Sequence, residues 1–553
     1  MGIPVATITS ARQKLPETVE LLSLEVRREL NRVPEAILTL LDGSVALRKF
    51  EVSDTDFFAP GKLITVAMRY EGDKLNTVLF EGLVVRHAIE SRGEGSTLRV
   101  ELKDSAFKLT RARKTAVHRD GTDADAMRAI IGAYPGLKAK VDTTSPEHPE
   151  LVQFNATDWD FVLSRADVCG LVVNVHLGEV TVTKLALGAV KRKLDHGLGD
   201  VSDIALEIDS AEQWAAVKSV GWDAPAVAAT APEVAAQPSV KVGDLDAADI
   251  AKLLGGDEST MFHAAPFQPG ELKAWASARL LRSRHAMLRG KATVSGDGKL
   301  APLDTVEILG VGKKFNGKTL VSGVTHKVDN NGWQTELQLG LSPDWFAREP
   351  DIEDVPAGGL LPPVRGLQIG TVASLELDPK KELRVQVKLP LLADDQGFLW
   401  ARLASPDAGN QRGFSFRPEV GDEVVIGFLN EDPRQPIILG ALFGTKNLPP
   451  KPVETPTDTN DLRAIVSRAG TRIVFDDSLP SLTLETTADG SADGAYQNRI
   501  VVNQKDKKIS IEDEHGNVLL MDAAGITLTS AKDFTIDAGS GNVVIKGSKV
   551  DVQ

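Results

Sequence analysis

The last part of the chain, from Arg463 to Gln553, most narrowly limits what this sequence can fold into. It consists of short segments in which Ile, Val, Leu or Phe alternates with Thr, Ser, Lys or Asp, as in Ile526-Thr527-Leu528-Thr529. A period of two residues is typical of β-strands. The strands that we expect are 472–475, 481–485, 499–502, 508–512, 517–522, 525–530, 534–538, 542–546 and 549–552.

One apolar row per strand cannot enclose a core in a single copy, because a core needs apolar faces that meet each other. Three copies wound around a common axis meet this need, since each copy then turns its apolar row inward. From residue 508 onward the expected strands begin every seven to nine residues, which suits regular winding. The sequence therefore predicts a C-terminal trimeric β-helix over 462–553.

A second β-rich stretch covers residues 366–444, where short apolar runs alternate with turn residues. Val385 and Val387 share one face of a strand whose other face is polar. Two later runs, 423–429 and 437–443, are apolar on both faces, so they need cover outside the barrel as well as inside. This pattern predicts a small closed β-barrel that packs against another domain or another copy.

Three motifs follow one another in this stretch: FLWARLASP at 398–406, GFSFRPEVGDEV at 413–424 and FLNEDPRQPIILG at 428–440. Their order resembles the OB-fold domain of VgrG-type spike proteins, the central spikes of phage tails, type VI secretion systems and extracellular tail-like particles. The PEVGDEV turn followed at fixed distance by EDPRQPI is specific to that family. Asn430 departs from the family, which more often has a glycine or an acidic residue there, and we expect no change of fold from it.

The resemblance implies a mainly β fold with minor α content and three parts. Residues 1–350 form a phage hub-like, tube-docking base of two β-barrel-like subdomains with helices. Residues 364–446 form the OB-fold domain, and residues 462–553 form the trimeric β-helix needle. Proline-rich linkers at 349–363 and 448–458 stay extended between them, because proline cannot join a sheet. Some family members carry a lysozyme domain in the second linker, and this sequence does not.

The function implied by the resemblance is structural. A homotrimer joins the sixfold inner tube to a threefold membrane-puncturing needle, contacts baseplate proteins and touches the target membrane transiently when the sheath contracts. No catalytic, cofactor or metal residues are expected. A PAAR-like tip protein would dock on the blunt end of the needle, formed by Lys549, Val550, Asp551, Val552 and Gln553.

The resemblance does not decide between phage, type VI and extracellular particles. The segment 385–391 lacks the charged aromatic residues that are common in the second OB strand of type VI members, which favours an extracellular tail-like particle. The N-terminus lacks a basic segment followed by an apolar one, and so shows no signal peptide. We expect assembly in the bacterial cytoplasm, within a particle that can be released from the cell.

In the first 350 residues the sequence predicts strands separated by glycine-containing turns, with helices between some of them. Strands are expected at 36–41, 63–70, 77–86, 96–102, 171–177 and 179–187, and again between 292 and 341. Apolar residues at three and four spacing predict helices at 123–133, 158–169 and 269–288. Asn155 or Thr157 would cap the second helix. The segment 223–244, with three prolines and few large apolar residues, is expected to be a surface loop or arm.

Composition excludes several other classes of protein. The formal charge of −14 argues against a nucleic-acid partner, because phosphate binding needs clustered cations. No run approaches the roughly 18 apolar residues that span a bilayer. The single cysteine, Cys169, rules out a disulfide scaffold within the chain, and its apolar surroundings favour a buried, unreactive thiol.

Residues 312–319, GKKFNGKT, fit the phosphate-loop pattern of nucleotide-binding enzymes at every defined position. That chemistry needs a helix after Thr319, and the sequence continues as a glycine-containing strand, so a β-hairpin is favoured over an NTPase. A trimeric tailspike that binds or cleaves surface glycans is a second alternative. It requires an aromatic-lined groove, whereas residues 463–553 contain only Phe475, Tyr496 and Phe534 as aromatic residues.

Overall fold

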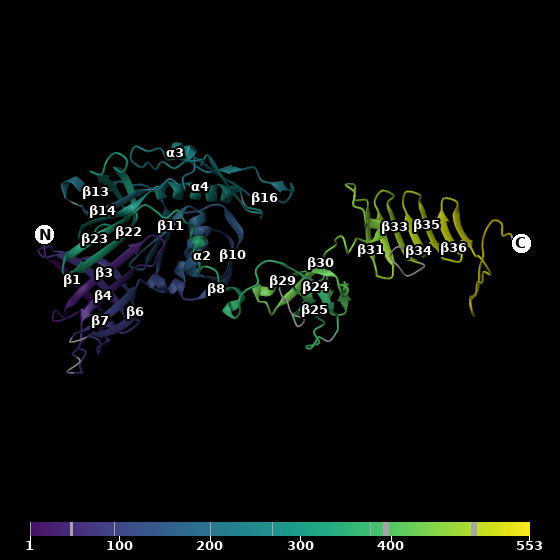
Figure 1. Ribbon diagram of the computed structural model, residues 1–553, viewed down its shortest axis with the longest axis horizontal. Helices are drawn as coiled ribbons and strands as arrows, with labels where there is room; N and C mark the ends of the chain where they lie inside the picture. The colour runs from purple at the N-terminus through teal and green to yellow at the C-terminus, as the bar shows by residue number, and fades with distance from the viewer. Residues whose placement is uncertain are drawn as a thin grey trace. The chain divides into compact units, whose positions relative to one another are not determined.

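The computed structural model describes residues 2–44, 48–92, 95–199, 201–267, 269–376, 378–390, 397–487 and 495–552. The chain divides into two compact units, Met1–Asp354 and Val355–Gln553. Strands dominate both units and helices are confined to a few places, which confirms the mainly β class (Figure 1). The boundaries expected for the three functional parts stay a prediction.

The first unit is built on one large sheet. Within the described residues it has 13 strands, ordered β14-β20-β23-β22-β3-β4-β7-β6-β5-β1-β2, with β21 and β13 branching from β22. The bounds are β1 Pro4–Ser10, β2 Gln13–Lys14, β3 Leu21–Glu29, β4 Glu35–Leu41, β5 Leu63–Tyr70, β6 Thr77–Arg92, β7 Gly95–Lys103, β13 Val190–Asp195, β14 Val201–Ile208, β20 Leu288–Ser295, β21 Thr305–Leu309, β22 Gly317–Asp329 and β23 Gly332–Leu339.

Two hydrophobic cores lie on this sheet. In β4 and β7 alternate residues such as Leu38 and Val100 are fully buried around Phe58, as expected when one face of a sheet is covered. A second core gathers around Val324 and Leu337 of β22 and β23. Because β3 pairs with β22, the two halves share one continuous sheet. The expected pair of barrel-like subdomains stays a prediction.

A helical layer covers a smaller sheet in the same unit. Helices α1 (Asp123–Gly132) and α2 (Asp158–Val168) each end one residue before the predicted end, which confirms both. The Thr157 side chain accepts a hydrogen bond from the Asp160 amide at 3.1 Å, so Thr157 caps α2. The neighbouring strands are β8 Arg113–Thr122, β9 Lys138–Val141, β10 Glu147–Thr157, β11 Leu171–His176 and β12 Glu179–Lys184.

The third helix expected, α4 (Pro269–Ala286), packs on a short sheet ordered β18-β15-β19. The surface arm expected at 223–244 is only partly correct. Its strand β18 pairs with β15, and Ala235 is buried against the α4 residues Ala276 and Leu280, because alanine lets backbones approach closely. The remaining elements here are β15 Ala216–Val220, β16 Trp222–Asp223, β17 Ala228–Ala229, β18 Glu233–Val234, β19 Glu258–Phe262 and α3 Ala247–Leu253.

The second unit begins with the small barrel that the sequence predicts. Strands β24-β25-β26-β30-β29 close on themselves around Val372, Val385 and Ile426. On β30 Ile438 is buried in the core and Leu439 is exposed on the outer wall, which confirms for this strand the expectation that both faces are apolar. The bounds are β24 Gln368–Ser374, β25 Val385–Lys388, β26 Phe398–Leu403, β27 Ala408–Gly409, β28 Arg412–Gly413, β29 Glu423–Phe428 and β30 Pro436–Ala441.

The rest of the second unit is a single antiparallel sheet whose strands neighbour one another in chain order (Figure 1). Its strands are β31 Leu462–Val466, β32 Arg472–Asp476, β33 Ser481–Thr487, β34 Tyr496–Asn503, β35 Lys508–Glu512, β36 Val518–Asp522 and β37 Gly525–Thr529. Short 3-10 helices lie elsewhere in the chain at η1 Asp56–Phe58, η2 Ser105–Thr110, η3 His196–Leu198, η4 Phe346–Arg348, η5 Pro356–Gly359, η6 Leu429–Glu431 and η7 Lys451–Val453.

The prediction of strands at 534–538, 542–546 and 549–552 is wrong for the single chain, which forms no strand there. These residues are irregular and exposed along their whole length. A strand needs a neighbour for its amides and cover for its apolar row, and within the described chain these segments have neither. The single chain forms an open sheet, and the β-helix of three copies stays a prediction.

Candidate functional site

The candidate site is one face of the C-terminal sheet, and the strand register builds it. Pairing brings Leu484 of β33 opposite Ile500 of β34, which in turn lies opposite Ile511 of β35. Because directly opposite residues share a face, the same alignment continues over the whole sheet. This first apolar row consists of Ile465, Ile473, Leu484, Ile500, Ile511, Leu519 and Leu528.

A second apolar row lies two residues further along each strand and therefore on the same face. It joins Phe475 of β32 to Leu482 of β33 and continues to the last strand. Its members are Phe475, Leu482, Val502, Ile509, Met521 and Ile526. Arg463 occupies the corresponding position on β31. The two rows form one continuous apolar face.

This apolar face is open to solvent. Most members of the two rows are exposed, from 37% for Leu484 to 71% for Ile526, while Ile473, Leu482 and Leu519 are half-buried. Monomeric proteins seldom expose contiguous apolar patches of this kind, and patches that they do expose commonly mark interaction sites. The face therefore has the character of an interface that lacks its partner.

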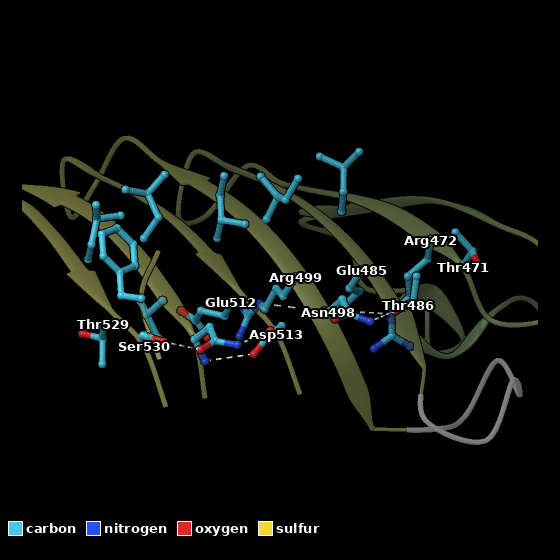
Figure 2. A pocket seen from close by; sticks show the side chains of 18 of the residues that line it. Thr471, Arg472, Glu485, Thr486, Asn498, Arg499, Glu512, Asp513, Thr529 and Ser530 are labelled. Atoms are coloured by element: carbon cyan, nitrogen blue, oxygen red, sulfur yellow. Dashed lines mark hydrogen bonds and ion pairs between the residues drawn. The ribbon is translucent and has the colours of Figure 1, made fainter. Parts of the chain in front are cut away.

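An open groove with a volume of about 810 Å³ runs along the first apolar row. Its other rim is polar and comes from residues at the strand ends, labelled in Figure 2 from Thr471 to Ser530. Asn498 Nδ2 donates to Thr486 Oγ1 at 3.2 Å, and Asn517 Nδ2 donates to Asp513 Oδ2 at 2.7 Å. Hydrogen bonds along this rim hold the strand ends in line and leave the apolar row uncovered.

The opposite face of the sheet is of a different kind. Arg472, Glu485 and Arg499 lie opposite one another on β32, β33 and β34. Arg472 pairs with the Glu485 carboxylate, and Arg499 Nε lies 3.8 Å from Glu485 Oε2. Charges of alternating sign compensate one another across neighbouring strands. These ion pairs satisfy the charges near the strand ends, and Val501 and Ser510 in the middle of this face are buried, so the two faces of the sheet differ in charge and in exposure.

The residues expected to dock a tip protein lie beyond the sheet. Val550 and Val552 are exposed, and Lys549 Nζ forms an ion pair with Asp551 Oδ2 at 2.6 Å. Gln553 lies outside the described residues. Residues 549–552 are not among those that line the groove described above, and their docking role stays a prediction.

Residues 312–319, which fit the phosphate-loop pattern, belong to a β-hairpin, as predicted. Strand β22 begins at Gly317, and Lys318 and Thr319 lie opposite Glu307 and Val306 of β21. Their amides belong to a ladder and cannot converge on a phosphate. The strand prediction after Thr319 is therefore confirmed, which removes the structural basis of the NTPase alternative.

A buried polar cluster in the first unit was not expected from the sequence. Asp123, at the start of α1, accepts from Arg165 Nε at 2.5 Å and lies 3.0 Å from His148 Nε2 and 3.3 Å from Cys169 Sγ. Arg165 also bonds Glu271 of α4 at 3.0 Å. The cluster ties helices together, and its members are too far apart in the chain for any spacing motif to reveal it.

The pKa shifts of buried Cys169, His285 and His326 fit a structural role for these side chains. Burial raises the pKa of the Cys169 thiol well above its usual value, as expected for an unreactive cysteine. Burial lowers the pKa of His285 and of His326 to about 4, so both are neutral near pH 7. Among the described residues no group of three or more His, Cys, Asp or Glu side chains is arranged to hold a metal ion.

Comparison with known proteins gives two family matches. Residues 2–330 match the family described as the Alg8 N-terminal domain. Residues 368–443, which are the barrel strands β24 to β30, match the type VI secretion system and phage-baseplate injector OB domain. The chain is thus a spike-type protein of the VgrG and phage-baseplate class. Since the first match covers more than half of its length, it belongs to the Alg8 N-terminal domain family.

Curated relatives match over short segments. The actin cross-linking toxin VgrG1 of Vibrio cholerae is 36% identical over 96 residues, which are 16% of this chain and 9% of that protein. The type VI secretion system spike protein VgrG2a of Pseudomonas aeruginosa is 32% identical over 174 residues, 29% of this chain and 21% of that protein. The chain thus spans only a small part of the length of these relatives.

Among solved structures, the chain is similar to a 43 kDa tail protein of prophage MuSo2 from Shewanella oneidensis, with TM-score 0.46 and 13% identity, covering 62% of this chain and 98% of that one. The lidded Francisella PdpA-VgrG complex contains a chain with TM-score 0.42 and 10% identity, covering 96% of this chain and 80% of that one.

No helix in the described ranges is long and apolar enough to cross a membrane.

Proposed function

We propose that this chain is the structural spike of a contractile injection system and that it works as a homotrimer. The observation that carries the proposal is the pair of unbroken apolar rows on the C-terminal sheet, from Ile473 to Leu528 and from Phe475 to Ile526. Membership of a spike-type class supports it. The work of puncture comes from sheath contraction, so the proposed role is mechanical and needs no catalytic residue.

The energetics favour covering the rows with copies of the same chain. Removing each 40 Å² of apolar surface from water contributes on the order of 1 kcal/mol. Each strand from β32 to β37 offers two such side chains, and three copies bury them against one another. A threefold arrangement also leaves the charged row of Arg472, Glu485 and Arg499 on the outside, where it needs no partner.

The association state of the purified full-length chain tests this proposal. Light scattering coupled to size exclusion should give three times the mass of one chain across a hundredfold range of concentration. A well-folded monomer at high concentration would contradict the proposal, because the apolar face would then stay in water.

We assign binding of the inner tube and of the baseplate proteins to the base, residues 1–350. The needle would make transient contact with the target membrane. The match of residues 2–330 to the Alg8 N-terminal domain family, separate from the OB-domain match at 368–443, supports this division. Assembly would take place in the bacterial cytoplasm, within a tail-like particle that can be released. Pull-down of the recombinant tube protein by residues 1–354 tests the assignment, and failure to bind would contradict it.

Docking of a separate PAAR-like tip is the second partner proposal. Exposed Val550 and Val552 offer apolar surface for it. Deleting 549–553 should leave the trimer intact and abolish co-purification of the tip protein. If the shortened spike still retains the tip protein, the docking surface lies elsewhere.

A further inference from the structure

The last residues of the first unit, 351–354, lie beside the two-stranded sheet of β8 and β10. Strand β10 contains a β-bulge in which Asn155 has a left-handed backbone with φ 43°, and the Asn155 amide donates to Thr115 Oγ1 of β8 at 3.1 Å. Asparagine tolerates this conformation, and bulges redirect side chains out of a sheet. Thr157 caps α2, and the Asn155 side chain instead donates from Nδ2 to Asp354 Oδ2 at 2.8 Å.

Arg113, the first residue of β8, holds the same segment through its guanidinium group. Its Nη1 donates to the Ile352 carbonyl at 2.8 Å, and its Nη2 donates to the carbonyls of Asp351 at 2.8 Å and Glu353 at 3.1 Å. The Nη1 atom also donates to the Asn155 carbonyl at 2.9 Å, which ties the segment to the bulge. One planar donor group therefore binds three consecutive carbonyls, which is a use of arginine that its fixed fork of donors favours.

The Arg113 cation also lies among carboxylates. Its Nε is 3.9 Å from Asp354 Oδ1. Burial raises the pKa of Asp160 in α2 above its usual value, and the charge of Asp351 adds to that rise whereas the charge of Arg113 opposes it. Without the cation, the carboxylates of the segment and of α2 would repel one another, because like charges destabilise each other's ionised form. The removal of Arg113 therefore favours release of 351–354.

The residues from η5 onward are bound to the barrel instead. Ala357 of η5 is 2% exposed, and η5 contacts η6. The Val364 amide donates to the Glu431 carbonyl at 2.9 Å, and Arg365 Nε lies 3.5 Å from Glu431 Oε2. The sequence predicts an extended linker over 349–363, and the structure differs because the first part of this stretch is bonded to the first unit and the second part to the barrel.

We propose that Arg113 is a latch that places the joint between the two units at the Asp354–Val355 peptide and keeps the tether at its shortest length. With the latch open, the remaining anchor is the Phe346 amide, which donates to Asp167 Oδ2 at 3.1 Å. About eight further residues would then be released, and they add roughly 27 Å of reach when extended. A short tether passes thrust from base to needle with little slack. That last consequence rests on the proposed function, whereas the latch itself does not.

Limited proteolysis of the full-length protein tests the latch. Cleavage after Glu353 by a glutamate-specific protease, and after Arg348 by trypsin, should be at least about tenfold faster in Arg113→Ala than in wild type, because a protease needs a locally opened segment. Mass spectrometry identifies the cleavage sites. The matched control is Arg119→Ala on the same strand, which removes only an exposed ion pair with Glu150 and should leave both rates unchanged. Equal rates in wild type and Arg113→Ala would overturn the proposal.

A second variant guards against general damage to the fold, which circular dichroism would detect as a lowered thermal transition of the first unit. Asn155→Gly keeps the left-handed backbone and removes the side-chain bond to Asp354, so cleavage after Glu353 should rise several-fold while the transition stays unchanged. No rise in this variant would overturn the proposal, even if Arg113→Ala unfolds.

The position of the joint has its own readout. Trypsin cleavage after Arg365 should be the same in wild type and Arg113→Ala, because Arg365 is held on the barrel side. A faster cut there in the variant would refute a joint at Asp354–Val355. A monomeric wild type in light scattering would refute the proposed function and leave these cleavage rates as they are, so the two failures can be told apart.

Discussion

Leu484 and Thr483 are neighbours on β33 with opposite surroundings. Leu484 belongs to the first apolar row, whereas Thr483 pairs with Val474 and Val501 on the outer face. We predict that Leu484→Asp abolishes trimer formation, because three carboxylates would be forced into an apolar interface without partners. Analytical ultracentrifugation of the full-length variant measures the loss directly.

Thr483→Asp is the matched control for this substitution. It adds the same charge one residue away, on the face without the apolar rows, and should leave the sedimentation coefficient unchanged. If both variants dissociate, the effect reflects general damage to the strand. If neither dissociates, the apolar rows are not the interface.

Asp123 provides a test of the buried cluster. It is 2% exposed and receives hydrogen bonds from Arg165 and His148. Asp123→Ala takes from the half-buried Arg165 cation one of its carboxylate partners. Breaking a buried ion pair in this way costs about 3 kcal/mol of unfolding free energy. Urea denaturation followed by tryptophan fluorescence measures it, with exposed Glu150→Gln as a control that should change little.

The same cluster gives a pH dependence with a defined sign. Burial alone would raise the pKa of Asp123, but hydrogen bonds from Arg165 and His148 outweigh it and hold the pKa below its usual value. A carboxylate with a lowered pKa stabilises the fold above its unfolded pKa of about 4 and loses that contribution as pH falls through the folded pKa. Wild type should therefore lose stability below pH 4 more steeply than Asp123→Ala, as urea titrations from pH 6 to pH 3 would measure.

Residues of the apolar rows could be predicted from the sequence, while those of the buried cluster could not. Alternation in Ile526 to Thr529 specifies a strand face locally, because side chains alternate in any strand. Asp123, His148 and Glu271 come from α1, β10 and α4, and only the packing of these elements brings them together. Long-range proximity of polar groups leaves no periodic signal in a single sequence.

At the scale of elements, local signals located strands and helices well. Strand β5 has the predicted bounds, and α2 carries the predicted cap, since both follow from periodicity and capping chemistry. The arm at 223–244 failed in part because Ala235 packs against α4, a contact that composition does not reveal. The segments after β37 show the opposite error, where a correct strand pattern lacks the neighbours that would make it a strand.

The cap of α2 gives a prediction for one element. Thr157 Oγ1 accepts from the Asp160 amide at 3.1 Å, satisfying one of the free donors of the first helical turn. Thr157→Ala should lower the unfolding free energy of the first unit by about 1 kcal/mol, whereas Thr157→Ser should retain most of it. Thermal unfolding followed by circular dichroism compares the two, and an equal loss in both would show that the methyl group matters instead of the hydroxyl.

At the scale of the whole chain, the large sheets of the two units differ in the side chains that they present to solvent. In the first unit Glu35 forms ion pairs at 3.2 Å with both Arg27 and Lys103, so neighbouring strands compensate one another's charges. In the second unit the C-terminal sheet exposes aliphatic rows. A charged face can remain in water, whereas an aliphatic face requires a partner. Association is therefore expected from the second unit.

This division predicts the outcome of removing residues 447–553. The cores of the first unit are formed by its own residues, and the barrel has its own core around Val372 and Ile426. The shortened chain should therefore stay folded, with the thermal transition of the first unit unchanged, but run as a monomer in light scattering. A shortened chain that remains trimeric would move the main interface to the barrel, where exposed Ile369 and Leu439 form the apolar strip available for it.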